Sequence, residues 1–318
     1  MSGPGGKRAP DFSIVIPAYN SRGFIGAAVR SCIQQTHRNL EVIVVDDGST
    51  DDTADVVSAL GAEDSRVLVI TTENRGGAAA RNAGADAARG RLLTFLDSDD
   101  LLMPDYLAAV GRALSEHPAA GFAYCWAWVL DEGPRRIRRE LDASRFGADE
   151  SIPAGAEELI SELLDGNFIG GVRTLRPEAL ASVGGYDEGL RYVEDYDLWL
   201  RLIPRGWEVV RLAEPLAILR DRADALHTDQ AAMFSTLARV LEKVSDDEEV
   251  PERLRTLARR RRDDQLEALA AVQRPAAAAA WRARVATVAL RRRLRPWRFW
   301  HREPPAEVAA AFADLKRL

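Results

Sequence analysis

Short apolar runs rich in β-branched residues alternate with helical patterns through the first 116 residues of the chain. The expected strands are 12–16, 42–45, 67–70 and 92–96, and the expected helices are 23–35, 51–60, 78–88 and 104–116. The run at 42–45 is apolar at every position, which is typical of a strand covered on both faces. This rhythm predicts an α/β fold with a mostly parallel, Rossmann-like sheet and helices on both of its faces.

The second half of the chain has weaker patterns. Residues 131–155 are polar and irregular, which predicts a long surface loop. Helical patterns follow at 156–164, 177–183 and 194–202. From Thr228 onward Ala, Leu, Arg and Glu dominate, so this part is expected to be almost wholly helical.

Charge is unevenly distributed along the chain. Residues 251–318 hold 17 Lys or Arg and 7 Asp or Glu, whereas the rest of the chain holds 26 and 42. An acidic body with a basic tail indicates two regions with different roles. We therefore expect a flexible tail at 1–10, an α/β domain at 11–226 and a basic C-terminal helical region at 227–318.

Cysteine content and hydropathy bear on the compartment. Cys32 and Cys125 have no metal-ligand spacing, which favours two buried core thiols in a reducing compartment. The Gly/Pro-rich start at 1–10 lacks the apolar core of a secretion signal. The longest apolar run, 118–130, is too short to span a bilayer. These features predict a cytoplasmic protein, with the inner face of the membrane as a further location.

Polar residues follow each of the first four expected strands, at the point where the strand ends. In parallel sheets, ligands bind at this edge, beyond the carboxyl ends of the strands. The residues that meet there are Pro17, Ala18, Tyr19 and Asn20, then Asp46 and Asp47, then Arg75 and Gly76, and finally Asp97, Ser98 and Asp99. Acids, small residues and an arginine on one edge are hard to explain as structure alone, and they predict a ligand site.

Asp97 and Asp99 are candidate ligands for a divalent cation. Carboxylate oxygens suit Mg²⁺ or Mn²⁺, and such an ion neutralises the charge that develops on a diphosphate leaving group. Taken alone, an acid-x-acid pair is equally a solvated turn that caps the next helix. Its position after a buried strand favours the metal site.

The other residues at this edge each have two interpretations. Asp46 and Asp47 can accept hydrogen bonds from a nucleobase or ribose, or they can order the turn before the next helix. Arg75 and Arg81 can contact a ligand or lie as solvated surface charges. Gly76, at the start of a helix, allows a ligand to approach the backbone closely.

Acids also open the helix expected at 194–202. Glu194 and Asp195 can be ordinary first-turn residues, which the helix dipole favours. A carboxylate at the mouth of the site can also take the proton from an attacking hydroxyl, as a general base.

Five segments around these residues resemble glycosyltransferase family 2, whose members have the GT-A fold. They are 13–20 (SIVIPAYN), 41–53 (EVIVVDDGSTDDT), 73–84 (ENRGGAAARNAG), 95–100 (FLDSDD) and 183–202 (VGGYDEGLRYVEDYDLWLRL), in the family's order. Five matches in order are far more specific than any one of them. The resemblance implies an inverting, metal-dependent enzyme that moves a sugar from a nucleotide-diphosphate sugar to an acceptor hydroxyl. Such enzymes serve cell-surface polysaccharide, glycolipid or natural-product glycosylation.

The resemblance also assigns roles to single residues. The nucleotide-binding positions are Pro17, Tyr19, Asp46, Asp47 and Arg75. Asp97 and Asp99 match the motif that holds the metal and the diphosphate. Asp195 matches the catalytic base, with Glu194 as the alternative.

The chain departs from the family after the strand expected at 215–219. Many members have Arg-x-His there, with the histidine near the metal or the diphosphate. In this chain Arg222 occupies the register of that histidine, and His227 comes five residues later. Either Arg222 contacts the diphosphate or His227 reaches the metal from a longer loop, and the register favours Arg222.

Two other classes of function compete with glycosyl transfer. A nucleotidyltransferase would need a Gly-rich, basic loop after the first strand, and Pro17 to Asn20 do not form one. A non-catalytic module that binds a nucleotide sugar is disfavoured because Asp97, Asp99 and Asp195 are intact. A dehydrogenase would need G-x-G-x-x-G after the first strand, which is absent.

The tail at 281–301 holds seven arginines and three tryptophans. Such segments are typical of peripheral membrane contact, where arginines meet anionic lipid, and a lipid-linked acceptor would suit that location. The same arginines could instead pair with the acidic domain. Nothing else in the chain supports binding to nucleic acid, and the acceptor hydroxyl is not identified by any motif.

Overall fold

The computed structural model describes residues 9–131, 136–140, 155–221 and 229–273. Their strands form one nine-stranded sheet in the order β3-β2-β1-β4-β8-β6-β9-β5, with β7 paired to β6. The strands are β1 (Phe12–Ala18), β2 (Leu40–Asp46), β3 (Val67–Thr71), β4 (Leu92–Phe95), β5 (Leu101–Leu102), β6 (Ala120–Asp131), β7 (Arg136–Glu140), β8 (Arg173–Leu175) and β9 (Glu208–Asp221). The helices are α1 (Ile25–Ile33), α2 (Thr53–Glu63), α3 (Gly77–Ala87), α4 (Tyr106–Glu116), α5 (Ala156–Asp165), α6 (Pro177–Ser182), α7 (Glu194–Leu202), α8 (Gln230–Asp246) and α9 (Glu252–Gln273), with a 3-10 turn at Ile203–Arg205.

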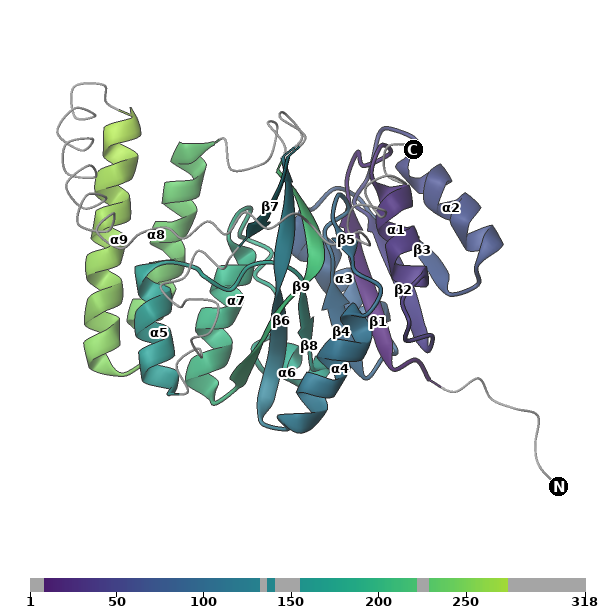
Figure 1. Cartoon of the computed structure of the whole chain (residues 1–318). Helices are drawn as coiled ribbons and strands as arrows, with labels where there is room; N and C mark the ends of the chain where they lie inside the picture. The colour runs from purple at the N-terminus through teal and green to yellow at the C-terminus, as the bar shows by residue number, and fades with distance from the viewer. Residues whose placement is uncertain (1–8, 132–135, 141–154, 222–228, 274–318) are drawn as a thin grey trace.

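Helices cover both faces of the sheet, as the sequence predicts (Figure 1). Successive side chains of a strand point to opposite faces. Ile14 and Ile16 of β1 therefore join a core cluster with α1, α2 and α4. Val15 joins a second cluster on the other face, with α3, α6 and α7.

The sheet is parallel in its first half and mixed in its second. The strands β3, β2, β1 and β4 pair in parallel, as expected from the strand–helix rhythm. The three-residue strand β8 then pairs antiparallel with both β4 and β6. The longest ladder of the second half, between β6 and β9, is again parallel. The apolar run at 118–130 supplies β6, which periodicity cannot distinguish from a buried helix.

The prediction of a surface loop at 131–155 is wrong for Arg136–Glu140. This segment is the strand β7, which pairs antiparallel with β6. Four of its five residues are charged, and charged strands at the margin of a sheet lack the apolar alternation that identifies a strand. Its pairing comes from backbone hydrogen bonds, which leave no pattern in the sequence.

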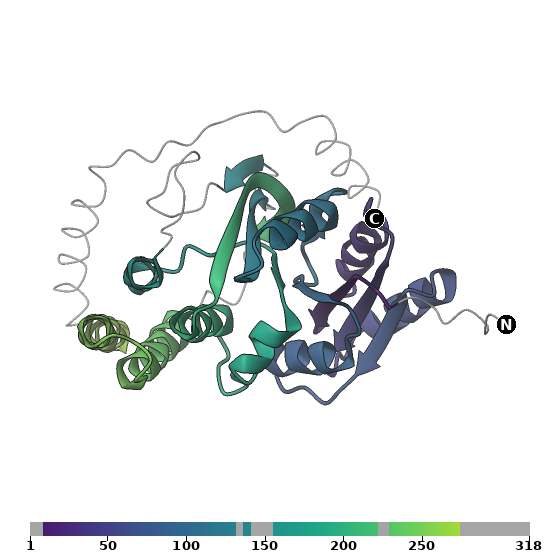
Figure 2. The same ribbon diagram turned by 90° about the horizontal axis from the view of Figure 1, so that it is seen from below.

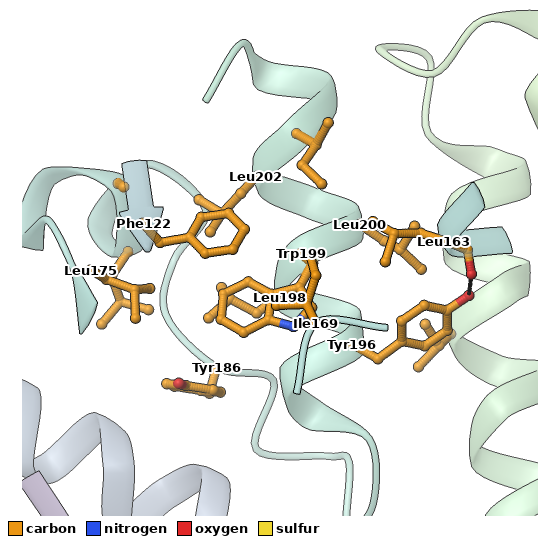
Figure 3. Close-up of a cluster of buried hydrophobic side chains, with 14 of the residues drawn as sticks. Phe122, Leu163, Ile169, Leu175, Tyr186, Tyr196, Leu198, Trp199, Leu200 and Leu202 are labelled. Atoms are coloured by element: carbon orange, nitrogen blue, oxygen red, sulfur yellow. Dashed lines mark hydrogen bonds between the residues drawn. The ribbon is translucent and has the colours of Figure 1, made fainter. Parts of the chain in front are cut away.

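The helix α7 is held at the centre of the second core cluster. Trp199 is fully buried and stacks on Phe122 of β6, with ring centroids 4.3 Å apart and planes at 16° (Figure 3). The Tyr196 hydroxyl donates a 2.7 Å hydrogen bond to the Leu163 carbonyl of α5. Truncating a buried Trp typically costs about 3–5 kcal/mol, so this packing fixes α7 firmly against the sheet.

The C-terminal helices α8 and α9 lie side by side next to α5 and α7 (Figures 1 and 2). Val240, Leu241 and Leu254 belong to the same core cluster as Trp199. Arg253 and Arg261 of α9 form ion pairs with Glu157 and Asp165 of α5. The described part of the basic region is therefore packed on the α/β domain, with some of its charge neutralised there.

Two predictions about the termini fall wholly or mostly on residues that the structure does not describe. The tail at 281–301 lies outside the described residues, and so do residues 1–8 of the expected N-terminal tail. Among the helices that are described, none combines the length and the hydropathy that crossing a bilayer requires.

Candidate active site

The loops that follow β1, β2 and β4 are joined by hydrogen bonds at one edge of the sheet. The Asn20 side chain accepts a 2.8 Å hydrogen bond from the Thr50 amide, and the Asn20 amide donates to the Ser49 hydroxyl at 2.9 Å. The hydroxyls of Ser21 and Ser98 lie 2.7 Å apart. The predicted convergence of these loops is therefore found in the structure.

Asp46 and Asp47 are buried, and both order loops. The Asp47 carboxylate accepts hydrogen bonds of 2.8 Å from the backbone amides of Arg75 and Gly76. Asp46 accepts one of 3.2 Å from the Ser49 amide. The interpretation that these residues order the turn before the next helix is thus correct for Asp46, whereas Asp47 orders the loop that follows β3. Contact of either residue with a nucleobase or ribose stays a prediction.

Tyr19, Arg75 and Gly76 at this edge are accessible to a ligand. Tyr19 is 50% exposed, and the Arg75 side chain is 65% exposed although it pairs with Glu188. Gly76 has φ +93°, and a Cβ there would meet nothing within 4 Å. An aromatic face, a guanidinium and an open glycine backbone suit a nucleotide base and its phosphates.

The acids after β4 lie in a strongly charged environment. Arg81 donates a 2.6 Å hydrogen bond to one oxygen of Asp97, whose side chain is 49% exposed. Burial alone would raise the pKa of Asp97, but the Arg81 and Arg173 guanidiniums outweigh it and hold that pKa below its ordinary value. Asp97 is therefore a carboxylate at neutral pH, as a metal ligand must be.

Asp99 and Asp100 complete the turn after β4. The Asp99 carbonyl accepts a 2.8 Å hydrogen bond from the Arg220 side chain, and Asp100 accepts one of 3.0 Å from the Arg220 amide. Burial, together with the charges of Asp97 and Asp99, raises the pKa of Asp100 well above its ordinary value. The turn is thus bound to β9, and Asp100 serves as an internal acceptor.

The donor set fits a magnesium- or manganese-type site that a substrate completes. In the described part of the chain, no three carboxylate, imidazole or thiolate groups converge on one point. Mg²⁺ in phosphate-transfer sites is commonly held by one or two carboxylates together with substrate phosphates and water. Asp97 and Asp99 can supply such carboxylates. The further contacts predicted at Arg222 and His227 lie outside the described residues.

Arg81 is an internal residue, so its interpretation as a solvated surface charge is wrong. It is 8% exposed, and its second nitrogen donates a 2.7 Å hydrogen bond to Glu194. A residue of α3 therefore joins the acid motif after β4 to the first turn of α7. Because helix periodicity placed Arg81 on an ordinary helix, only the tertiary fold reveals this bridge.

Glu194 and Asp195 follow a residue with an unusual backbone conformation. Val193, which precedes them, has φ +51°, a left-handed conformation that β-branched residues rarely adopt. Burial raises the pKa of Glu194 above its ordinary value, while Arg81 opposes this rise and Asp195 adds to it. Asp195 has a different partner, because its carboxylate accepts a hydrogen bond from Arg173 of β8.

A cavity of about 130 Å³ opens beside Asp195. It is lined by residues 124–127 of β6, residues 167–171 and Asp195, and Glu194 is not among the residues that line it. Gly171, with φ +69°, allows the close approach of these segments, since a Cβ there would lie 2.7 Å from the Cys125 carbonyl oxygen. Of the two adjacent acids, only Asp195 is presented to a space that a second substrate could enter.

Comparison with known proteins places this arrangement in a family. The family described as Glycosyl transferase family 2 matches residues 13–183, which is more than half of the chain. The chain belongs to glycosyltransferase family 2.

Among curated relatives of this glycosyltransferase is an uncharacterized glycosyltransferase of Haemophilus influenzae. It is 31% identical over 210 residues, which cover 64% of this chain and 66% of that protein. The chondroitin synthase of Escherichia coli is 35% identical over 200 residues, covering 63% of this chain and 27% of that protein. The chain thus spans less than two thirds of the length of these relatives.

Two solved structures share the fold of this glycosyltransferase. TarS 1–349 of S. aureus in complex with UDP-GlcNAc has a TM-score of 0.58 and 18% identity, covering 81% of this chain and 71% of that chain. The mannosyltransferase PcManGT of Pyrobaculum calidifontis, in complex with GDP-Man and Mn²⁺, has a TM-score of 0.61 and 20% identity, covering 98% and 88%. These likenesses confirm the predicted GT-A fold.

Sequence reasoning missed one charged residue of this candidate site, Arg173. Because β8 pairs with β4, Arg173 lies opposite Phe95 in the sheet. Phe95 in turn comes two residues before Asp97 in the sequence. The segment Arg173–Leu175 is too short to produce a strand pattern. No signal in the single sequence could therefore have placed Arg173 between the two acid motifs.

Proposed function

We propose that this glycosyltransferase is an inverting, metal-dependent enzyme that transfers a sugar from a nucleotide-diphosphate sugar to an acceptor hydroxyl. The observation that carries the proposal is that its acids lie in two separate places. Asp97 and Asp99 follow β4 at the loop edge of the sheet, whereas Asp195 lines the cavity on the other side of Arg173. A donor site at Asp97 and an acceptor site at Asp195 would thus lie on either side of the ion pairs made by Arg81 and Arg173.

The donor would lie across the loops after β1, β2 and β4. Tyr19 offers an aromatic face for the base, the exposed Arg75 guanidinium offers donors for the ribose or the phosphates, and Gly76 leaves room for them to approach the backbone. A divalent ion held by Asp97 and Asp99 would neutralise the diphosphate as it leaves. Arg222 or His227 is proposed as a further contact to the same group. The donors bound in the two structural neighbours, UDP-GlcNAc and GDP-Man, support this class of substrate.

The acceptor would approach from the cavity beside Asp195. Its hydroxyl oxygen attacks the anomeric carbon from the face opposite the diphosphate, forming the new glycosidic bond while the bond to the diphosphate oxygen breaks. The Asp195 carboxylate takes the hydroxyl proton, and the nucleoside diphosphate leaves with the bonding electrons. A single displacement of this kind inverts the configuration at the anomeric carbon.

The stereochemistry of the product tests the proposal. Donors with an α-linked sugar, such as UDP-GlcNAc and GDP-mannose, can be incubated with the enzyme and Mn²⁺, with water as acceptor. Proton NMR of the first sugar released, before it mutarotates, should then reveal the β anomer. Initial release of the α anomer would contradict the single displacement and the role of Asp195 with it.

A further inference from the structure

Arg173 is the best-anchored cation beside the candidate base. Its side chain is almost buried, and one guanidinium nitrogen donates to Asp195. The guanidinium lies over the Trp199 ring, 5.8 Å from its centroid. Because Trp199 is itself fully buried and stacked on Phe122, the guanidinium rests on a rigid aromatic stack.

The strand that carries Arg173 is fixed independently of this ion pair. The hydroxyl of Thr174, the next residue, lies 2.7 Å from that of Thr94 on β4 and 2.9 Å from that of Tyr106 on α4. These buried hydrogen bonds hold β8 against the strand that leads to Asp97. A shift of β8 relative to β4 would have to break them.

The other oxygen of Asp195 is also occupied. It accepts a 2.7 Å hydrogen bond from the Tyr196 amide. The carboxylate is therefore held at both oxygens, by the helix backbone on one side and by Arg173 on the other. Of these two, only the Arg173 contact comes from outside α7, so it is the one that holds the Asp195 carboxylate itself against the sheet.

We propose that Arg173 is a positioning residue, which holds the Asp195 carboxylate at a fixed place relative to Asp97 and the cavity. This inference rests on the proposed function of Asp195 as base. Arg173 acts through Asp195 and not on the substrate. Within the described residues its Nε atom is buried and has no hydrogen-bond partner, which carries a desolvation cost.

Replacing Arg173 with lysine separates the effect of its charge from the effect of its geometry. Lysine keeps the positive charge, but it lacks the planar guanidinium that stacks on an indole and donates in a fixed direction. A misplacement of about 1 Å can cost about 100-fold in rate. R173K should therefore lower kcat by about 10- to 100-fold while the donor KM stays within about twofold.

The experiment measures nucleoside diphosphate release from UDP-GlcNAc or GDP-mannose with Mn²⁺, with water as acceptor, in the full-length chain. Arg176 provides the matched control. It lies three residues further on, and within the described residues its side chain donates to the carbonyls of Ala120 and Leu114, at 2.8 and 2.7 Å. R176K should lower the melting temperature without changing kcat. R173Q, which keeps a planar amide donor, takes the place of R173K if that variant does not fold.

A double-mutant cycle separates this inference from the proposed function. D195N alone must lower kcat, and if it does not, the proposed base is wrong and the inference falls with it. If D195N does lower kcat, adding R173K should lower it no further, because Arg173 works through Asp195. An equal additional loss in the D195N background would overturn the inference, as would a normal kcat for R173K.

Discussion

Arg81 and Glu194 are 113 residues apart in the sequence, and their side chains meet at 2.7 Å. The same guanidinium donates to Asp97 at 2.6 Å. The acid motif after β4 and the acid pair of α7 are therefore joined through one buried arginine. This arrangement spaces the proposed metal site and the proposed base in advance, which lowers the cost of organising them during the reaction.

The first prediction concerns the stability that this bridge provides. Replacing Arg81 with Met leaves two carboxylates without their shared cation, so R81M should lower the free energy of unfolding by about 3 kcal/mol. Arg75, which pairs with Glu188 at the exposed surface, is the control, and R75M should cost less than about 1 kcal/mol. Urea unfolding at pH 7 measures both. Equal effects of the two substitutions would mean that the Arg81 bridge is not buried as described.

The second prediction separates the two acids of α7. D195N should keep donor affinity and lower turnover by about 10²- to 10⁴-fold, the usual range for a general base. E194Q should have a smaller effect on turnover, because Glu194 faces Arg81 and not the cavity. Steady-state kinetics together with donor titration distinguish the two. A large loss in E194Q with near-normal D195N would exchange the assignments.

How far the sequence predicts the molecule depends on whether a feature is local. The strands of the first half and the loops that follow them were predictable, because β-branched runs and turn residues determine them within a few positions. The bridge at Arg81 and the placement of Arg173 were not, because both depend on pairings between distant segments. The strand Arg136–Glu140 was not predictable for a different reason, because four of its five residues are charged and it lacks the apolar alternation that identifies a strand.

The third prediction tests the donor side at Tyr19. Its exposed ring is expected to stack on the nucleotide base, an interaction worth about 1–3 kcal/mol per base where aromatic residues bind nucleic acids. Y19A should therefore raise the donor KM about tenfold or more with little change in kcat. Y19F retains the ring and should be close to wild type. Equal effects of the two variants would point to the hydroxyl instead of the ring.

The fourth prediction concerns acid stability at Glu41. This carboxylate is 4% exposed and accepts hydrogen bonds from the Ser13 hydroxyl at 2.6 Å and the Arg89 amide at 2.8 Å. Burial would raise the pKa of Glu41, but these hydrogen bonds and the Arg89 charge outweigh it and lower that pKa below its ordinary 4.5. The resulting stability is present above pH 4.5 and is lost as the pH falls through the lowered value.

E41Q should accordingly be less stable than wild type by about 1–3 kcal/mol at pH 7. The difference should narrow as the pH falls from 4.5 through the lowered pKa of Glu41, because the carboxylate is then protonated first in the unfolded and finally in the folded protein. Urea unfolding of both proteins at a series of pH values between 7 and 3 measures this difference in the free energy of unfolding. A difference that stays constant over this range would show that the charge of Glu41 contributes nothing.

The central claim is that Asp97 and Asp99 hold a divalent ion on a nucleotide-diphosphate sugar. The most direct measurement is nucleoside diphosphate release from a panel of UDP-, GDP-, dTDP- and CDP-sugars, with Mn²⁺ or with EDTA. It compares wild type, D99N and D86N, where Asp86 is an exposed acid of α3 that serves as control. We predict release by wild type and D86N from at least one donor with Mn²⁺, none with EDTA, and none by a folded D99N. Release that EDTA leaves intact, or near-normal turnover by D99N at the same Mn²⁺ concentration, would contradict the account.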